Sequence, residues 1–476
     1  MLPVVDVVIV GGGISGLSAA RELCRQGLRV RLLERAERCG GVIKTLRVGD
    51  CVVDFGPDTL LAHKPAALAL CRELGLEDQL VAPMSPRTLY LLRSGTFHAL
   101  PEASMMGLPA NWTSLATSRA FTWRGKFRMG CEIFLPAGPR RSDESIASFI
   151  GRRFGSEAVT CLAEPLLAGL HRGNAQRLSM RALFPSLLDG EQRHGSVIRA
   201  LSKNRSGNGR AGSMSLRGGL SHLPERLEQS LPRDVVMTGV NVKSVGKTGT
   251  GQYTVTFDET SADERRITAR AVLFATPAHV TARLVDGVDL ELAKMCGAIE
   301  YASSVTVALA YAKNAVRDPL KGWGFVVPAA ERRLVTTVSW VSSKWPDRAP
   351  ENQVLIRASI GRHGQSAPLE NSDVALTAWA DDDLRELLGI TAPPIATQVC
   401  RWPQAMPQLH VGHLDRMGAL DRRLASLPGL FISAAGFRGA GIPDCIADAQ
   451  TTAKDAAAYI RALSATDTSP TSEVFA

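Results

Sequence analysis

Residues 4–34 read VVDVVIVGGGISGLSAARELCRQGLRVRLLE, and this stretch decides the fold class. Residues 4–10 are almost wholly apolar, which is typical of a strand buried on both faces of a parallel sheet. A glycine turn and an amphipathic helix follow, Gly27 ends the helix, and residues 28–33 form a second predicted strand that closes at Glu34. The apolar face of the helix carries Ile14, Leu17, Ala20 and Cys24. A strand, a helix and a strand in this order predict a β-α-β unit of an α/β protein.

The turn Gly11-Gly12-Gly13-Ile14-Ser15-Gly16 matches the pattern GxGxxG. Gly11 permits the tight turn, Gly13 lets the backbone approach a pyrophosphate, and Gly16 lets the helix pack on the strand. The helix N-terminus offers N–H donors and the positive end of its dipole to phosphates. Glu34 stands 18 residues after Gly16, where its carboxylate can bind ribose hydroxyls. Because these features fall in register, a dinucleotide site is favoured over a glycine-rich turn without a ligand.

Two further stretches favour FAD over NAD. Gly40-Gly41 follows Glu34 closely, as in the longer fingerprint of FAD enzymes. Residues 430–446 read LFISAAGFRGAGIPDCI, a predicted strand that ends in glycines before a helix with proline in its first turn. The positive end of such a helix can stabilise a reduced, anionic flavin. The alternative is that this stretch only packs a strand against a helix and binds no cofactor.

The composition indicates which ligands and which cellular environment suit the protein. Lys and Arg number 55 against 46 Asp and Glu, and the net charge of +9 fits an anionic ligand, an acidic membrane surface or ordinary solubility. Nine cysteines without a CxxC pair predict a reduced, cytoplasmic chain without a structural metal. The sequence contains neither a secretory segment before the first strand nor 18 consecutive apolar residues, so we expect no membrane-spanning helix. We expect no nucleic-acid partner.

These features resemble the monoamine-oxidase-like FAD superfamily, and further stretches narrow the resemblance to the oxygen-dependent porphyrinogen oxidases. That group comprises the protoporphyrinogen oxidases and the related bacterial coproporphyrinogen oxidases. The matching stretches are DFGPDT at 54–59, EPLLAG at 164–169, RLSM at 177–180, SLRGGL at 215–220, KWPDRAP at 344–350, RW at 401–402, MPQ at 406–408, HVGH at 410–413 and GIPDCI at 441–446. They extend over nearly the whole chain.

The resemblance implies an α/β fold with a Rossmann-type FAD-binding domain, a sheet-based substrate domain and a helical membrane-contact region. We expect the FAD-binding domain to comprise residues 1–85, 206–285 and 400–465, and the substrate domain residues 86–98 and 286–399. The helical region would then be 99–205, and residues 466–476 a disordered tail rich in Ser and Thr.

The resemblance also implies one reaction in haem biosynthesis. A porphyrinogen loses six electrons in steps that reduce FAD, and oxygen reoxidises the flavin to give hydrogen peroxide. Protoporphyrinogen IX is the expected substrate, and coproporphyrinogen III is the alternative. An amine oxidase, a carotenoid desaturase or a non-catalytic escort protein on the same fold are further alternatives. Three partners are further alternatives: the inner face of the cell membrane, a downstream chelatase, and a second copy of the chain in a homodimer.

Family contacts with FAD carry over to many positions of this chain. Val42 stands where some relatives have a larger residue. The expected contacts are Gly11, Gly12, Gly13, Ile14, Ser15, Gly16, Glu34, Arg35, Gly41, Val42, Gly56, Pro57, Asp58, Thr59, Val242, Trp402, Ile442, Pro443 and Asp444.

The expected substrate residues carry marks of both branches. Arg87 matches an arginine that pairs with a substrate propionate in plant and animal protoporphyrinogen oxidases, whereas Lys64 matches a cation of the bacterial coproporphyrinogen enzymes. Gly169 falls in the loop that borders the substrate. The aromatic residues Trp323, Phe325 and Trp345 are candidates for packing on the pyrroles, although aromatic residues near a sheet more often belong to the core.

The chain departs from the family after Gly169. The family usually reads aliphatic-Tyr-Ala-Gly-Asp there, and residues 170–174 read LHRGN. His171 and Arg172 would favour a substrate with more carboxylates, or would face solvent, and the second interpretation is slightly favoured.

No residue pair suggests acid–base or metal chemistry, so we name no catalytic residue and expect positioning to supply most of the catalysis. His410 and His413 lack the other ligands of a zinc site. Asp143 and Glu144 are predicted to cap a helix that starts near residue 145. Residues 99–138 mix aromatic and basic side chains, which fits an interfacial helix or, equally, a buried amphipathic helix with a basic outer face.

Overall fold

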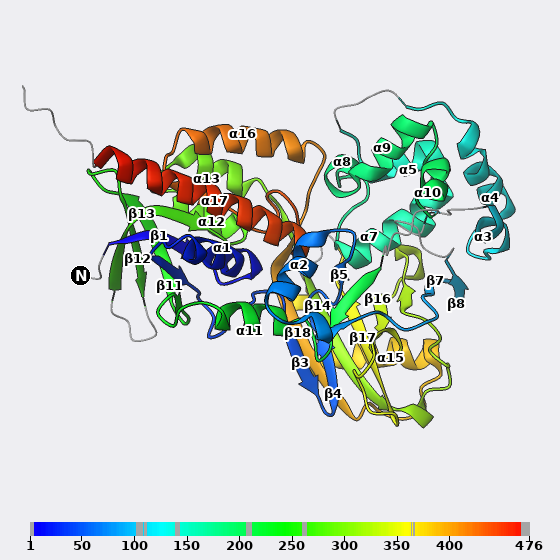
Figure 1. Cartoon of the computed structure of the whole chain (residues 1–476). Helices are drawn as coiled ribbons and strands as arrows, with labels where there is room; N and C mark the ends of the chain where they lie inside the picture. The colour runs from blue at the N-terminus through cyan, green and yellow to red at the C-terminus, as the bar shows by residue number, and fades with distance from the viewer. Residues whose placement is uncertain are drawn as a thin grey trace, which may run out of the picture.

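The computed structural model describes residues 4–100, 108, 112–138, 143–205, 212–258, 264–362, 364 and 367–467. The tail expected after residue 466 falls almost wholly outside these ranges. The molecule has three parts: a mainly parallel sheet covered by helices, a second sheet, and a cluster of helices (Figure 1). They meet around α2 (Pro65–Glu73) and α7 (Glu164–Leu170).

The predicted β-α-β unit is confirmed. Strand β1 (Val5–Val10) is buried along its whole length and pairs in parallel with β2 (Val30–Leu33), and α1 (Ile14–Arg25) connects them. The other neighbour of β1 is β13 (Glu264–Phe274), whose second half is parallel to β1 and whose first half continues antiparallel into β12. The sheet order is β10 (Val236–Met237), β2, β1, β13, β12 (Tyr253–Asp258) and β11 (Asn241–Lys247), with β19 (Leu430–Ile432) on β13.

Alternate residues of β1 enter two different cores. Val7 and Ile9 pack under α1, α11 (His222–Gln229) and α17 (Ile442–Asp467). Val8 and Val10 pack on the opposite face, under α12 (Ala278–Val285), α13 (Leu290–Gly297) and α16 (His413–Ala425). Burial on both faces is why residues 4–10 are continuously apolar instead of alternating with polar residues.

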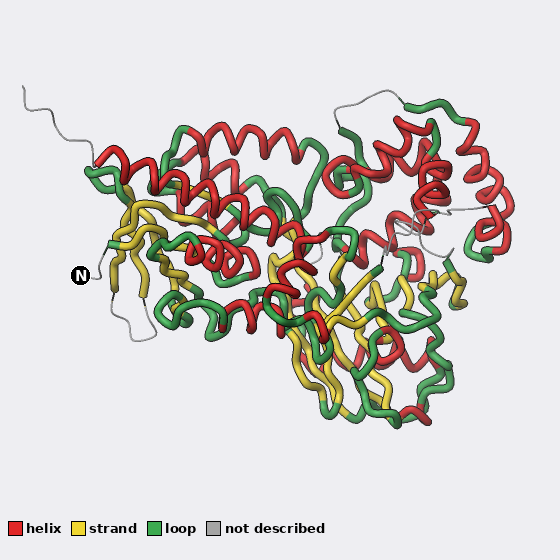
Figure 2. The backbone as a smooth tube through the Cα atoms, viewed as in Figure 1, coloured by secondary structure: helices red, strands yellow, loops and turns green. Residues whose placement is uncertain are grey.

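The second sheet also has two different faces. Its strands lie in the lower part of Figure 2. Its order is β18 (Ala396–Pro407), β14 (Tyr301–Ala312), β17 (Gln353–Ile360), β16 (Val335–Trp340), β15 (Gly324–Val326), β7 (Leu89–Arg93) and β8 (Thr96–Ala99). One face, with Val307 and Val338, packs on α15 (Asp373–Leu388). We call the other the inner face. The register places Thr306, Ser339, Thr337, Ser359 and Arg357 together on it.

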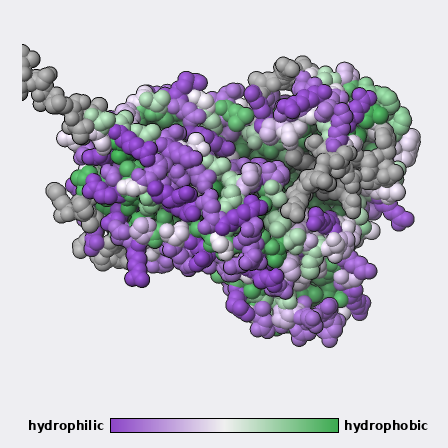
Figure 3. Space-filling model, in the orientation of Figure 1, coloured by the Kyte–Doolittle hydropathy of each residue, from purple (hydrophilic) through white to green (hydrophobic). Residues whose placement is uncertain are grey.

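The helical part has its own core. Its elements are α3 (Trp112–Thr117), α4 (Trp123–Gly130), η3 (Cys131–Phe134), α5 (Ile146–Phe154), α6 (Ser156–Ala158), η4 (Val159–Ala163), α7, α8 (Met180–Leu183), α9 (Pro185–His194) and α10 (Val197–Arg205). Phe121, Phe149 and Phe154 belong to this core, which also touches Val326 of β15. Figure 3 shows apolar side chains gathered on the outer end of this part.

The prediction that Asp143 and Glu144 cap the helix near residue 145 is wrong. Ser145 caps α5, since its hydroxyl accepts a hydrogen bond from Ser148 N at 3.1 Å. Asp143 instead accepts from Ser179 Oγ at 2.8 Å and from Gly412 N at 2.9 Å, and so links the helical part to the start of α16. Glu144 pairs with Arg152 at 2.7 Å. A short hydroxyl next to the helix competes better for the free N–H groups of its first turn.

Two expected boundaries lie elsewhere in the structure. The boundary at 399/400 falls inside β18, which pairs with β14 from Ala396 to Pro407, so the second sheet extends to residue 407. The boundary at 285/286 falls before α13, which packs under the first sheet with α12 and α16.

The N-terminal segment also supplies small elements between the sheets: β3 (Thr45–Val48), β4 (Cys51–Asp54), β5 (Leu60–Leu61), η1 (Glu77–Gln79) and β6 (Leu80–Val81). Strands β5 and β6 both pair with β9 (Ser213–Leu216). The remaining short elements are η5 (Lys313–Ala315), η6 (Ala329–Glu331), α14 (Val341–Lys344) and η7 (Ala367–Glu370).

A buried ion pair joins the loop after α14 to β4. Arg348 Nη2 lies 2.9 Å from Asp54 Oδ2, and both side chains are at most 2% exposed. The same nitrogen donates to Ser215 Oγ and Leu216 O at 3.2 Å. The pair therefore fixes three segments that are distant in sequence.

We expect Arg348→Met to lower the free energy of unfolding by about 3–5 kcal/mol, because it leaves the Asp54 carboxylate buried without its cation. Chemical denaturation measures the loss. The matched control is Arg217→Met, which breaks an ion pair with Asp347 whose partners are 60% and 57% exposed. This change should cost less than about 1 kcal/mol. Equal losses for the two variants would contradict the assigned role of burial.

Candidate flavin and substrate site

The glycine turn is shaped by two close backbone contacts and one open side. Gly11 has φ +108, and a Cβ there would lie 2.7 Å from Ala275 O. A Cβ on Gly16 would lie 1.9 Å from Gly11 O, so only glycine lets α1 begin this close to β1. A Cβ on Gly13, in contrast, meets no atom within 4 Å. The turn is thus closed toward the protein and open at the position where the sequence predicts a pyrophosphate.

Two other segments lie beside this turn. Glu34 follows β2 and accepts hydrogen bonds from Gly12 N at 2.6 Å and from Ala36 N at 2.8 Å. Gly40 N donates to Gly12 O at 2.8 Å, and a Cβ on Gly41 would lie 3.5 Å from Gly13 Cα. The expected acid and the second glycine pair therefore lie beside the turn.

The loop 54–59 is held in place by cations from the second sheet. Asp58 accepts from Lys344 Nζ at 2.9 Å and from Arg357 Nη2 at 3.1 Å. Burial opposes ionisation of this carboxyl, but the charges of Lys344 and Arg357 together hold its pKa well below the ordinary value. Arg357 also donates to Asp54 O at 2.6 Å and Gly56 O at 3.1 Å, and Thr306 Oγ1 donates to Phe55 O at 3.2 Å. The loop is thereby fixed against the inner face.

Sequence reasoning missed Arg357. Its only signal was a charge in an otherwise apolar strand, VLIRASI at 354–360. A buried or half-buried arginine inside a sheet needs a partner, and here the partners are two carbonyl groups and Asp58.

The start of α17 also reaches this place. Asp444 forms an ion pair with Lys64 at 2.7 Å, although 380 residues separate them. Both residues stand at the beginning of helices, Lys64 directly before α2 and Asp444 in the first turn of α17. The structure thus brings an expected FAD contact and an expected substrate cation together as partners.

The remaining expected FAD contacts lie on several elements. Val42 is 42% exposed, and Gly56 approaches it so closely that a Cβ would meet Val42 O at 1.9 Å. Val242 lies on β11 near Glu34, since Val240 N donates to Glu34 O at 2.9 Å. Arg35 is exposed. Trp402 on β18 is half-buried, and its indole N–H has no partner among the described residues. An open glycine turn, a carboxylate beside it and two helix starts fit a flavin dinucleotide.

Arg87 and Trp323 lie at the outer edge of the region formed by the loop 54–59 and the inner face. Arg87 is exposed and makes no hydrogen bond or ion pair with the described residues. The segment that carries it is held by Trp323, whose N donates to Thr88 O at 2.8 Å and whose Nε1 donates to Met84 O at 3.2 Å. Lys344 Nζ lies 5.7 Å from the centre of the Trp323 ring. Arg87 therefore stands free on a segment adjacent to the Lys344–Asp58 pair.

Phe325 and Trp345 do not face a ligand site. Phe325 is fully buried on the α15 face of the second sheet, where its ring centre lies 4.7 Å from that of Phe97. It is in register with Val338, so the pleat turns it away from the inner face. Trp345 is 1% exposed and packs in a core with Phe55. Both rings are core residues, so the expectation that Phe325 and Trp345 contact the pyrroles of the substrate is wrong.

The segment after Gly169 is enclosed by the second sheet. A Cβ on Gly169 would lie 2.7 Å from Thr337 Oγ1 on the inner face. Burial, and to a smaller extent the charge of Lys64, lowers the pKa of His171 to about 4. Burial and the charge of Arg357 lower the pKa of Arg172 to about 10. Both side chains are half-buried, and Arg172 is hydrogen-bonded to Thr336, so they do not simply extend into solvent as the favoured interpretation held.

The histidines of the HxxH motif make ordinary structural contacts. His413 begins α16, and its Nε2 lies 2.7 Å from Phe437 O. His410 lies 3.7 Å from Glu300. Within the described ranges, no three His, Cys, Asp or Glu side chains are grouped so that they could hold a metal ion.

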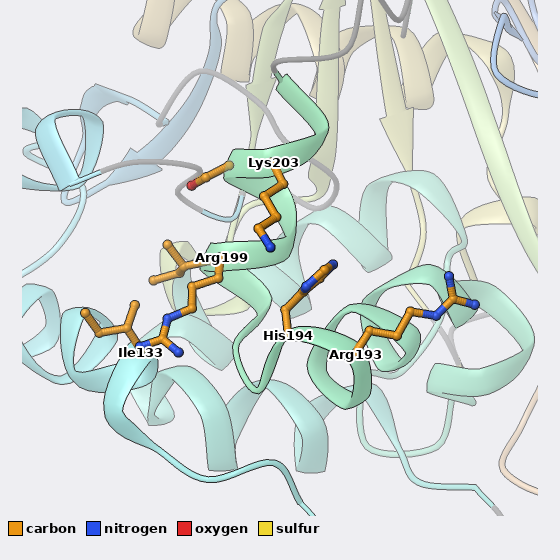
Figure 4. A pocket seen from close by; sticks show the side chains of 7 residues that line it. Ile133, Arg193, His194, Arg199 and Lys203 are labelled. Atoms are coloured by element: carbon orange, nitrogen blue, oxygen red, sulfur yellow. The ribbon is translucent and has the colours of Figure 1, made fainter.

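A separate basic pocket lies in the helical part (Figure 4). It has a volume of about 620 Å³ and contains none of the expected site residues. Its lining comes from the end of α9, from α10 and from η3: Ile133, Arg193, His194, Ile198, Arg199, Ser202 and Lys203.

Comparisons with known proteins agree with this geometry. Residues 14–457 match the family of flavin containing amine oxidoreductases. The chain is 32% identical to the coproporphyrinogen III oxidase of Bacillus subtilis (strain 168) over 95% of this chain and 98% of that protein. It is 27% identical to protoporphyrinogen oxidase 2, chloroplastic/mitochondrial, of Arabidopsis thaliana over 89% and 88% of the two chains. A solved structure from Exiguobacterium sp. 255-15, assigned as a protoporphyrinogen oxidase, superposes with a TM-score of 0.85 at 28% identity, over 96% of this chain and 100% of that one.

The chain belongs to the flavin containing amine oxidoreductase family. Within it, the chain is an enzyme of the FAD-dependent porphyrinogen oxidase group, as the resemblance predicted.

We expect Gly13→Val to give protein without FAD and with an unchanged fold. Gly13 has extended backbone (φ −70, ψ 179), and a Cβ there meets no protein atom within 4 Å, so a valine side chain would extend toward the side on which a pyrophosphate would lie. Absorbance of the purified variant and its circular dichroism measure the two effects. The control is Gly246→Val on β11, which also has open space and should keep its flavin. Stoichiometric flavin in the Gly13 variant would contradict the assignment.

Proposed function

We propose that this enzyme oxidises coproporphyrinogen III to coproporphyrin III in haem biosynthesis, with oxygen as electron acceptor and hydrogen peroxide as product. The observation that carries the proposal is the likeness to bacterial coproporphyrinogen III oxidases over 95% of the chain. This favours the alternative substrate over protoporphyrinogen IX, the substrate first expected from the sequence. A position in the cytoplasm is consistent with the proposal.

The glycine turn, Glu34 and the start of α17 would hold FAD. Bound FAD would take up the electrons that the porphyrinogen loses and release them to oxygen. N–H groups at the start of α1 would bind the pyrophosphate, and Glu34 would accept from ribose hydroxyls. Lys344 and Arg357 contribute indirectly, because they fix the loop 54–59 that carries four of the expected contacts.

The inner face of the second sheet would orient the substrate. Its threonine and serine hydroxyls and the cations beside it suit an apolar ring with carboxylates at its edge better than they suit a small amine. Arg87 stands free at the outer edge, where it would grip a propionate. Catalysis would then come from holding one carbon of the ring at a fixed place, since no acid–base pair is needed for positioning.

The assay that tests this compares initial rates of oxygen consumption with coproporphyrinogen III, protoporphyrinogen IX and putrescine. We expect kcat/KM to be highest for coproporphyrinogen III, by about tenfold or more, because each additional charged hydrogen bond contributes roughly 1.5–3 kcal/mol in a partly dry site. A higher value for protoporphyrinogen IX would restore the first expectation. Turnover of the amine alone would overturn the proposal.

The helical part would rest on the inner face of the cell membrane. No helix in the described part of the chain is both long and apolar enough to cross a bilayer. Trp123 and Phe127, one turn apart on α4, are 74% and 69% exposed, and Phe134 on η3 is 77% exposed. Arg124 stacks over Trp123, and the basic pocket begins at Ile133. Exposed aromatic residues beside cations favour an anionic interface.

We expect the wild type to bind vesicles that contain anionic lipid, and to bind them less at high salt. The double variant Trp123→Ser/Phe127→Ser should bind at least about tenfold more weakly, because each ring contributes roughly 1.5–3 kcal/mol when it is buried. Vesicle sedimentation measures the change. The control Leu290→Ser removes a side chain that is 56% exposed on α13, far from α4 in the fold, and should leave binding unchanged. Absence of wild-type binding at low salt would exclude this location.

A further inference from the structure

Arg172 stands where the three parts of the molecule meet. It lies two residues after the end of α7, and its φ of +52 falls in a backbone region that residues other than glycine rarely adopt. Its Nη1 donates to Ala168 O at 3.3 Å, to Thr336 Oγ1 at 3.2 Å and to Thr337 Oγ1 at 3.5 Å. All these partners are neutral, and they anchor one nitrogen of the guanidinium against β16. Nε and Nη2 have no hydrogen-bond partner within the described ranges.

The charge of Arg172 is not balanced by a carboxylate. Two fully buried arginines of the chain do have one: Arg348 pairs with Asp54, and Arg153 pairs with Glu132. Arg172 forms no ion pair with a described residue. Burial and the charge of nearby Arg357 lower its pKa to about 10. The group still carries its charge at neutral pH. A half-buried, unpaired guanidinium costs free energy unless an anion joins it.

The neighbouring charges do not supply that anion. Asp58 lies between two cations, Lys344 and Arg357. Asp444 is paired with Lys64, which lies near His171. With Arg172, four cations therefore face two carboxylates in this region, and the excess is two positive charges. His171 adds no charge at neutral pH, because its pKa is lowered to about 4.

We propose that Arg172 binds a propionate carboxylate of the substrate through Nε and Nη2 and thereby selects a tetracarboxylate porphyrinogen over a dicarboxylate one. The inference rests on the proposed function and deepens it. The fork of two N–H groups matches the two oxygens of a carboxylate, and the threonines of β16 hold it in one orientation. Coproporphyrinogen III carries a propionate on each of its four pyrroles, and protoporphyrinogen IX carries one on only two adjacent pyrroles. Only the first can therefore present a second carboxylate to Arg172 whichever of its propionates Arg87 holds.

The test uses the holoenzyme and porphyrins that it cannot oxidise. Binding of coproporphyrin III, of its tetramethyl ester and of protoporphyrin IX is measured by quenching of tryptophan fluorescence for the wild type, Arg172→Gln, Arg172→Lys and Arg47→Gln. The last variant removes one charge from an exposed position on β3. Flavin content and thermal stability of each protein are recorded alongside.

We expect Arg172→Gln to weaken binding of coproporphyrin III by about ten- to a hundred-fold, which is the contribution of a charged hydrogen bond. Binding of the ester and of protoporphyrin IX should change less than about threefold, and Arg172→Lys should recover part of the loss. Flavin content should stay normal, and Arg47→Gln should match the wild type.

Equal weakening for all three porphyrins, or none, would overturn the role of Arg172. Loss of flavin in Arg172→Gln would instead make the cofactor its partner, and would also overturn it. The proposed function is tested separately, by wild-type turnover of coproporphyrinogen III. If that turnover is absent but the selective loss of coproporphyrin binding occurs, the carboxylate site stands and the assigned reaction fails.

Discussion

The placement of the loop 54–59 against the second sheet is the constraint on which the site depends. Asp58 is held by Lys344 and Arg357, and Asp54 by Arg348, so cations from one part of the molecule fix a loop of another. All three ion pairs are half-buried or buried, where screening by solvent and salt is weak. Without them the glycine turn and the inner face would each form, but their separation would not be fixed.

This constraint separates two tasks. The first sheet, buried on both faces, supplies a rigid base from which the glycine turn and the start of α17 project. The second sheet packs on α15 with one face, and its inner face combines apolar side chains such as Ala308 and Leu355 with hydroxyl groups and Arg357. A surface that mixes hydroxyls and excess positive charge orients an anionic ring by its edge, whereas an apolar surface would allow several rotated poses.

The helical part differs from both sheets in what it exposes. It has its own core, yet it leaves three large aromatic side chains in solvent on α4 and η3. It borders the substrate side through α7 and the segment that carries Arg172. One end of this part is thus suited to an interface with lipid, and the other end to contact with a carboxylate.

The sequence by itself determined the β-α-β unit, the flavin family and most of the segments that meet at the glycine turn, because these depend on local periodicity, on glycine geometry and on contiguous motifs. It did not determine that Phe325 and Trp345 are core residues, since strand register decides which face a side chain takes. It did not determine the partners of Lys64 and Asp58 either, as each ion pair joins residues hundreds of positions apart. The enclosure of Arg172 likewise follows from the packing of α7 on β16, and burial and unpaired charge are properties of that packing rather than of any local pattern.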